Sequence, residues 1–165
     1  MRIGIISDTH GHAERLRGAL DIFQAHGVGA IVHCGDVGSR QCVEVLAAAA
    51  CEVYMVSGNV DRDVQQLIEL AEELDVHFAG EVVEVPLGDG RCLVATHGND
   101  QRVLGELVSE GNFPYVCHGH THKPRNEKIG DVRVINPGAI HSPKGARTVA
   151  VLDTDTDAVE HVLVP

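Results

Sequence analysis

Short apolar runs alternate with amphipathic segments through the first half of the chain, and this alternation constrains the fold more than any other feature. Ile3–Ile6 is a continuous apolar run, which predicts a strand buried on both faces. Ala13–Ala25 repeats apolar residues at helical spacing and is followed by the helix-stop pair His26-Gly27. The same order recurs twice, with strands expected at Ala30–His33 and Cys51–Val56 and helices at Gln41–Ala50 and Val64–Leu74. Parallel strands joined by right-handed crossovers follow from this order.

The second half is expected to form hairpins. Asp89-Gly90 and Gly130-Asp131 are turn signals between apolar runs. The expected elements are strands at Val82–Leu87, Arg91–Thr96, Tyr115–Cys117, Glu127–Ile129, Val132–Ile135, Thr148–Leu152 and Val159–Val164, and a helix at Gln101–Glu110. The sequence therefore predicts an α/β protein with a mixed sheet or two packed sheets covered by helices. With 165 residues, the chain is expected to form one domain over residues 1–165.

Composition excludes several kinds of partner. The chain has 13 Lys and Arg against 24 Asp and Glu, a net charge of −11, and only 3% aromatic residues, which argues against binding duplex nucleic acid. We expect a cytoplasmic protein without a membrane partner, because no apolar run approaches the ~20 residues of a membrane span and no signal-peptide core follows the N-terminus. The five cysteines are odd in number and lack a Cys-x-x-Cys pair, which favours reduced thiols. A high-salt cytoplasm, an ordinary acidic cytosolic protein and a homo-oligomer all stay open.

Polar side chains gather just past the carboxyl ends of five expected strands. The groups are Ser7-Asp8-Thr9-His10, His33-Cys34-Gly35-Asp36, Ser57-Gly58-Asn59-Val60-Asp61, Thr96-His97-Gly98-Asn99-Asp100 and His118-Gly119-His120-Thr121-His122. Most of these groups, taken alone, are typical of a turn. In open α/β sheets, however, strand carboxyl ends border a shared crevice. Five such groups together predict one shared metal centre.

The donors in these groups indicate what the centre holds. They are Asp8, His10, Asp36, Asn59, His97, His120 and His122. Seven oxygen and nitrogen donors are too many for one tetrahedral zinc ion, so we expect two ions that share one carboxylate. The mixture of imidazole, carboxylate and amide favours Mn, Fe, Zn, Ni or Co over Ca or Cu(I).

Six motifs give the chain its resemblance to a known family. They are Ser-Asp-Thr-His-Gly (7–11), Cys-Gly-Asp-Val (34–37), Ser-Gly-Asn-Val-Asp (57–61), Thr-His-Gly (96–98), Gly-His-Thr-His (119–122) and Asn-Pro-Gly (136–138). Together they resemble the signature of the calcineurin-like metallophosphoesterases, in particular the small single-domain phosphodiesterase branch. The resemblance implies a four-layer α/β/β/α sandwich of two mixed sheets flanked by helices.

The resemblance also implies roles for the donors. Asp8, His10 and His122 would hold one divalent ion, Asn59, His97 and His120 the other, and Asp36 would bridge them. Manganese is the preferred ion, with nickel, iron, zinc or cobalt as alternatives. The implied reaction is hydrolysis of a small phosphodiester by in-line attack of a metal-bridging hydroxide.

One residue departs from the pattern of relatives with stronger phosphomonoesterase activity, which have histidine directly after the asparagine. Here that position is Val60, which cannot transfer a proton. His12 is the candidate for supplying that proton, and Asp61 is expected to orient a metal ligand as a hydrogen-bond acceptor. Two alternatives to the phosphodiesterase stay open: a protein-binding scaffold of the retromer-subunit type, and a metal-dependent phosphomonoesterase, which Val60 weakens.

Overall fold

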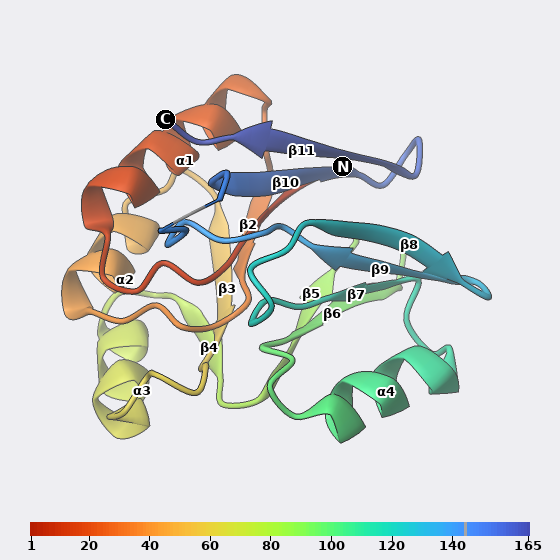
Figure 1. The fold of residues 1–165 in the computed structure, drawn as a ribbon, viewed down its shortest axis with the longest axis horizontal. Helices are drawn as coiled ribbons and strands as arrows, with labels where there is room; N and C mark the ends of the chain where they lie inside the picture. Colours follow the sequence, from red (N-terminus) through yellow and green to blue (C-terminus); the bar gives the residue numbers. More distant parts are fainter. Residues whose placement is uncertain (144) are drawn as a thin grey trace.

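Two mixed β-sheets lie face to face in the computed structural model, which describes residues 1–143 and 145–165. Three helices cover the outer face of the first sheet, and a fourth covers the outer face of the second (Figure 1). This is the four-layer α/β/β/α arrangement, so the expected fold class is confirmed.

The first sheet has six strands in the order β11-β10-β1-β2-β3-β4. Their bounds are β1 (Arg2–Ile6), β2 (Ala30–His33), β3 (Glu52–Val56), β4 (His77–Ala79), β10 (Thr148–Asp153) and β11 (Ala158–Leu163). Strands β1 to β4 run parallel, and the register pairs Ile6 with His33 and His33 with Met55. The carboxyl ends of β1, β2 and β3 are therefore level, which brings the loops that follow them to one edge.

The second sheet has five strands in the order β5-β6-β7-β9-β8. Their bounds are β5 (Val82–Pro86), β6 (Cys92–Thr96), β7 (Tyr115–Cys117), β8 (Arg125–Ile129) and β9 (Val132–Asn136). Strands β6 and β7 are parallel, and Ala95 pairs with Cys117. The histidine-bearing loops after these two strands consequently begin side by side.

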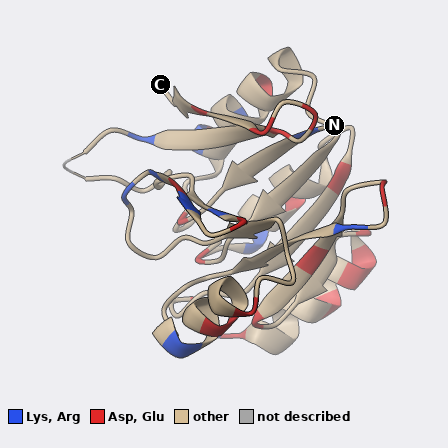
Figure 2. Ribbon diagram, turned by 90° about the vertical axis from the view of Figure 1, so that its right-hand side faces the viewer, with Lys and Arg blue, Asp and Glu red and all other residues tan. Residues whose placement is uncertain are grey.

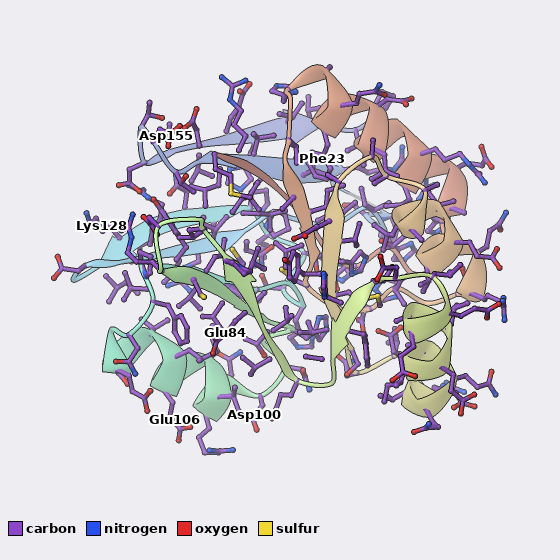
Figure 3. The ribbon with its side chains drawn as sticks, turned by 180° about the vertical axis from the view of Figure 1, so that it is seen from behind. Phe23, Glu84, Asp100, Glu106, Lys128 and Asp155 are labelled. Atoms are coloured by element: carbon purple, nitrogen blue, oxygen red, sulfur yellow. The ribbon has the colours of Figure 1, made fainter. Side chains whose placement is uncertain are left out.

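Apolar side chains fill each of the three interfaces between the layers. Phe23 on α1 (Ala13–Ala25) packs inward beneath the helices, together with residues of α2 (Arg40–Ala47) and α3 (Val64–Glu73) (Figure 3). Ile5 and Leu93 lie between the two sheets. Val94 on the other face of β6 packs against Leu104 of α4 (Gln101–Glu110). Alternate residues of β6 thus serve two cores, as the two-residue period of a strand requires.

Helix α2 and strand β4 differ most from the sequence prediction. Helix α2 ends at Ala47, three residues before the expected Ala50, and the Ala49 N–H bonds the Leu46 carbonyl in a tighter turn. The run of alanines after Leu46 carries no stop signal, so pattern alone places this end too late. Strand β4 was not predicted, because its three residues are too few to show a period.

Acidic residues occur along both helices and loops in the ribbon of Figure 2, as the composition implies. Within the part of the chain that the structure describes, no helix is both long and apolar enough to cross a membrane.

Candidate metal centre

Main-chain hydrogen bonds tie together the loops that follow β1, β2, β6 and β7. The Asp8 N–H donates to the Gly35 carbonyl at 3.0 Å and the His10 N–H to the Asp36 carbonyl at 2.9 Å. In the second sheet, the Gly119 N–H donates to the His97 carbonyl at 3.0 Å. The loops are thus fixed to one another before any side-chain contact is considered.

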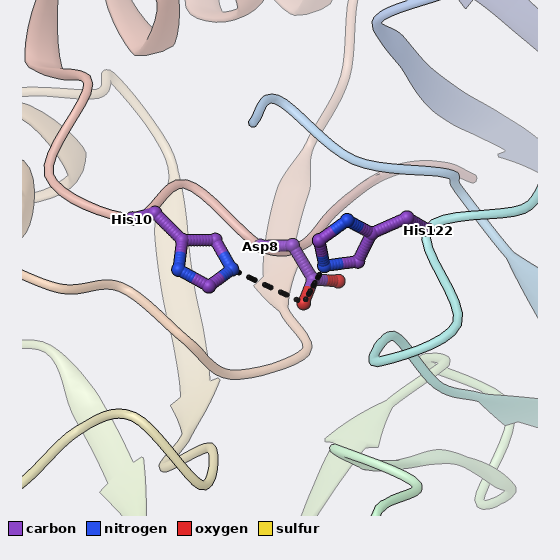
Figure 4. Close-up of side chains that lie close together, drawn as sticks. All are labelled: Asp8, His10 and His122. Carbon is purple, nitrogen blue, oxygen red and sulfur yellow. Dashed lines mark ion pairs between the residues drawn. The ribbon is translucent and has the colours of Figure 1, made fainter. Parts of the chain in front are cut away.

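Asp8, His10 and His122 form a group that we name the half-exposed cluster. The Asp8 Oδ1 atom lies 3.1 Å from His122 Nε2 and 3.8 Å from His10 Nε2 (Figure 4). The Asp8 side chain is fully buried, whereas 24% of the His10 side chain and 33% of the His122 side chain are exposed. One face of this cluster is therefore open to solvent.

Asp8, Asp36 and His97 form a second group that we name the buried cluster. Asp36 Oδ2 lies 3.4 Å from His97 Nε2 and 3.6 Å from His10 Nε2. This oxygen therefore faces nitrogen donors of both clusters, and the two clusters also share Asp8.

The unpaired atoms of the site fit a divalent cation. Asp8 Oδ2 accepts hydrogen bonds from the Ser7 hydroxyl at 2.6 Å and the His120 N–H at 3.0 Å. Asp8 Oδ1 and His10 Nε2, in contrast, are buried and have no hydrogen-bond partner among the residues that the structure describes. Leaving a buried carboxylate oxygen unpaired costs free energy, and a cation between these two atoms would remove that cost. Oxygen and imidazole donors at these separations are typical of first-row divalent ions.

Hydrogen bonding orients His97 toward the buried cluster. Its Nδ1 lies 2.8 Å from the Cys34 carbonyl, which can only accept, so Nδ1 carries the hydrogen. In the neutral ring, Nε2 then carries no hydrogen, and its lone pair is free to bind a metal ion. This atom faces Asp36 Oδ2 and lies 3.1 Å from Asn59 Oδ1. The structure thus adds Asn59 to the buried cluster.

His120 is placed differently from the other candidate ligands. Its main-chain N–H binds Asp8, while its exposed ring meets the His97 ring edge-on with centroids 5.2 Å apart. The ring lies beside the buried cluster but is not among the groups whose donor atoms converge.

Electrostatics within the buried cluster favour an ion pair. Burial acts to raise the pKa of Asp36, but contacts with His97 and the Val60 N–H outweigh it and hold the pKa below its ordinary value. Burial likewise acts to lower the pKa of His97, and the contact with Asp36 outweighs it and raises the pKa. The carboxylate of Asp36 is therefore kept ionised, as a metal ligand must be.

Five of the seven candidate ligands adopt a backbone conformation that sequence reasoning missed. They have positive φ angles, and they are Asp8, His10, Asp36, His120 and His122. Such angles are uncommon outside glycine, although Asp, Asn and His tolerate them best. Each costs about 1–3 kcal/mol, and such strain is concentrated at functional sites.

Two glycines allow the loops to approach the carboxylates closely. A Cβ atom on Gly58 would lie 2.1 Å from Asp36 Oδ1, and one on Gly119 would lie 1.8 Å from Ser7 Oγ. Because neither position has room for a side chain, the loops after β3 and β7 can close over the centre.

Asp61 joins the loop after β3 to the loop after β2. Its carboxylate accepts hydrogen bonds from the N–H groups of Gly38 and Gly58, both at 2.9 Å, and of Val37 at 3.2 Å. Asp61 therefore holds the segment that carries Asp36 through main-chain hydrogen bonds, and it belongs to neither cluster.

His12 lies beside the centre and contacts a residue whose role the sequence did not predict, His141. His12 Nε2 and His141 Nδ1 are 2.9 Å apart, and the two rings are stacked. The His141 ring also lies 4.9 Å, centroid to centroid, from the ring of His10. The Asn-Pro-Gly motif that begins at Asn136 was the available signal, because the Asn136 amide donates to the Gly119 carbonyl at 2.7 Å and so joins this segment to the centre.

Comparisons with known proteins find relatives that match nearly the whole chain. The chain is 31% identical over 166 residues to phosphodiesterase MJ0936 of Methanocaldococcus jannaschii, covering 99% of each chain. It is 28% identical over 184 residues to phosphodiesterase YfcE of Escherichia coli, covering 96% of this chain and 91% of that protein. A solved archaeal phosphodiesterase structure superposes with a TM-score of 0.90 at 31% identity, over 99% of this chain and 100% of the other.

More distant structures share the fold alone. Vps29 of Entamoeba histolytica superposes with a TM-score of 0.64 at 18% identity, over the full length of both chains. The model of the calcineurin-like phosphoesterase superfamily domain matches residues 1–157, and the chain therefore belongs to that superfamily.

Proposed function

We propose that this protein is a metal-dependent phosphodiesterase that hydrolyses a small phosphodiester at a centre of two divalent ions. The observation that carries the proposal is the pair of buried, unpartnered atoms, Asp8 Oδ1 and His10 Nε2, inside two donor clusters that share Asp8. Relatives named as phosphodiesterases and metallophosphoesterases support a metal-dependent phosphoesterase activity.

Each cluster would hold one ion, with Asp36 as the carboxylate that faces both. Ions bound there would lower the pKa of a shared water and clamp the attacking and leaving oxygens of an in-line displacement at phosphorus. The chain's own contribution is to keep Asp36 ionised and to hold Asp8 by Ser7 and the loop of His120. Manganese is the ion we propose first.

The side chain that follows Asn59 cannot assist the leaving group. Val60 is 38% exposed at the edge of the centre and has no proton to give. We propose His12 as the group that donates to the departing oxygen, with His141 holding its ring in place. Substrates with an acidic leaving alcohol would depend little on this proton donor, and those with a basic leaving alcohol would depend on it strongly.

Turnover of bis(p-nitrophenyl) phosphate by protein stripped of metal and reloaded with Mn²⁺ tests the proposal. We expect activity that depends on the ion and falls at least ~10³-fold in Asp36→Asn, since several kcal/mol of charge stabilisation are lost. Asp75→Asn, which makes the same charge change at an exposed turn position, is the control and should match wild type. The enzyme proposal fails if the turnover rate does not depend on the metal ion, or if the rate of Asp36→Asn equals that of wild type. The protein-binding scaffold then becomes the better proposal.

His12 has a test of its own. In His12→Ala, rates should depend more steeply on the pKa of the leaving alcohol across a series of aryl phosphodiesters, while the best leaving group is nearly unaffected. An unchanged dependence would remove His12 from the mechanism.

A further inference from the structure

A cleft adjoins the loops that carry the metal centre. It lies between the start of α2 and the length of α3, which are neighbours on the outer face of the first sheet (Figure 1), and its volume is about 730 Å³. Gly38, Val60 and Asp61 form its inner end. The cleft is thus walled by the same loops that carry Asp36 and Asn59.

The inner end of the cleft is one hydrogen bond from the proposed ligands. The Val60 N–H donates to Asp36 Oδ1 at 2.9 Å, while the Val60 side chain lines the cleft and is 38% exposed. Gly38 packs against the backbone of His10, where an added Cβ would lie 2.7 Å from the His10 carbonyl carbon. The cleft and the centre therefore meet at Val60, whose main chain contacts Asp36 and whose side chain lines the cleft.

The chemistry of the lining restricts what such a group can be. Val60 and Leu67 give the cleft apolar surface, and Leu67 is only partly buried against the core beneath α3. Four carboxylates line the cleft against two guanidinium groups. One of these two, Arg40, is already held by Glu73 at 3.6 Å and by Glu44 at 2.9 Å. The net negative charge of the lining would repel an anionic group, whereas it would not repel an uncharged apolar group.

We propose that this cleft receives one ester arm of the substrate and prefers an uncharged arm with apolar surface, such as an aryl ring, over an anionic arm. The proposal rests on the proposed function, because the phosphorus must be held at the metal centre. Val60 and Leu67 act as specificity-determining residues that contact the arm, and Glu69 on α3 acts as the charge that rejects anionic arms.

Phosphonates with a single arm test this without turnover, because their carbon–phosphorus bond is not hydrolysed. Calorimetric titration of the Mn²⁺-loaded protein should show phenylphosphonate binding about tenfold more tightly than methylphosphonate. In Leu67→Ala the preference should fall to about twofold or less. Circular dichroism of the variant checks that the fold is kept.

Charge reversal provides a second variant that does not depend on the apolar core. Glu69→Lys should improve 4-carboxyphenylphosphonate binding about fivefold relative to phenylphosphonate. Glu72→Lys is the matched control, since it makes the same change on the same exposed helix outside the cleft lining, and it should leave that ratio unchanged.

The proposal is overturned if no phosphonate binds, if Leu67→Ala keeps the wild-type preference, or if the two charge reversals behave alike. These outcomes are separable from failure of the proposed function. Phosphonate discrimination without phosphodiester turnover would remove the enzyme and keep the cleft as a binding site. Turnover without discrimination would remove the cleft alone.

Discussion

The buried cluster and the half-exposed cluster share Asp8 but are held in different ways. In the buried cluster, the Cys34 carbonyl fixes His97 and the Val60 N–H fixes Asp36, so the chain's own hydrogen bonds set the geometry. In the half-exposed cluster, Asp8 Oδ1 and His10 Nε2 form no hydrogen bond with any residue that the structure describes. The difference teaches that one half of the centre is preorganised by the fold, while the other half depends on an ion to satisfy it.

The largest expected effect comes from closing the space beside the buried cluster. Gly58→Ala would place a methyl group 2.1 Å from Asp36 Oδ1, and we expect it to lower the free energy of unfolding by about 3 kcal/mol. Gly105→Ala in α4 has open space around the new methyl and should be neutral or slightly stabilising. Urea unfolding of both variants measures the difference. Equal stabilities would show that the loop after β3 yields easily.

The two clusters should also respond differently to loss of a histidine in metal-free protein. His97→Asn removes a buried ring and its bond to Cys34, so the free energy of unfolding should fall by about 2 kcal/mol. His122→Asn removes a partly exposed ring, and the change should stay within about 0.5 kcal/mol. Urea titrations in chelator measure both. A reversed order would contradict the assignment of the preorganised half.

A smaller effect is expected at Asp61, which holds the backbone of the buried cluster and belongs to neither cluster itself. Asp61→Asn should weaken binding of the more tightly held ion by about 10–100-fold, because one of its acceptor oxygens becomes a donor. Calorimetric titration with Mn²⁺ measures the change, with Asp75→Asn as the control. Unchanged affinity would mean that the loops hold their places without this carboxylate.

The smallest effect concerns pH and the histidine beneath the buried cluster. Burial lowers the pKa of His33 to about 4, and the neutral ring accepts from the Gly35 N–H and bonds the Thr9 hydroxyl. The unfolded histidine titrates near pH 6.5, so this stabilisation is complete above that pH and is lost as the pH falls from 6.5 toward 4.

Between pH 7.5 and 5.5, His33 should account for a loss of about 1 kcal/mol in metal-free protein. We expect the drop in unfolding free energy over this range to be smaller by that amount in His33→Asn than in wild type. Identical pH dependence in the two proteins would show that folding does not lower the pKa of His33.

Much of the fold was predictable because its elements carry strong local patterns. β1 and β2 are continuous apolar runs, and the predicted helix Ala13–Ala25 has the bounds of α1. β4 could not be predicted, since its three residues form a strand only by pairing with β3. The late end predicted for α2 has the same origin, because the alanines beyond Leu46 carry no local signal for stopping.

The candidate site was predictable to the level of residues and not of contacts. The positions of the polar groups after the predicted strands indicated a shared centre, and the family resemblance implied the role of each residue. The sequence could not show that Asp8 takes part in both clusters, that the His120 ring stands apart, or that His141 stacks on His12. Each of these depends on how separate loops pack against one another, and His12 and His141 are 129 positions apart in the sequence.

The left-handed backbone at five of the candidate ligands has a consequence for how this centre can change over evolutionary time. At Asp8, His10, Asp36, His120 and His122 the peptide conformation, apart from any ion, selects against β-branched replacements. A descendant that lost its metals would therefore be expected to drift toward glycine, asparagine or aspartate at these positions. The residue types at these five positions would therefore still mark the former metal-binding site after the activity was lost.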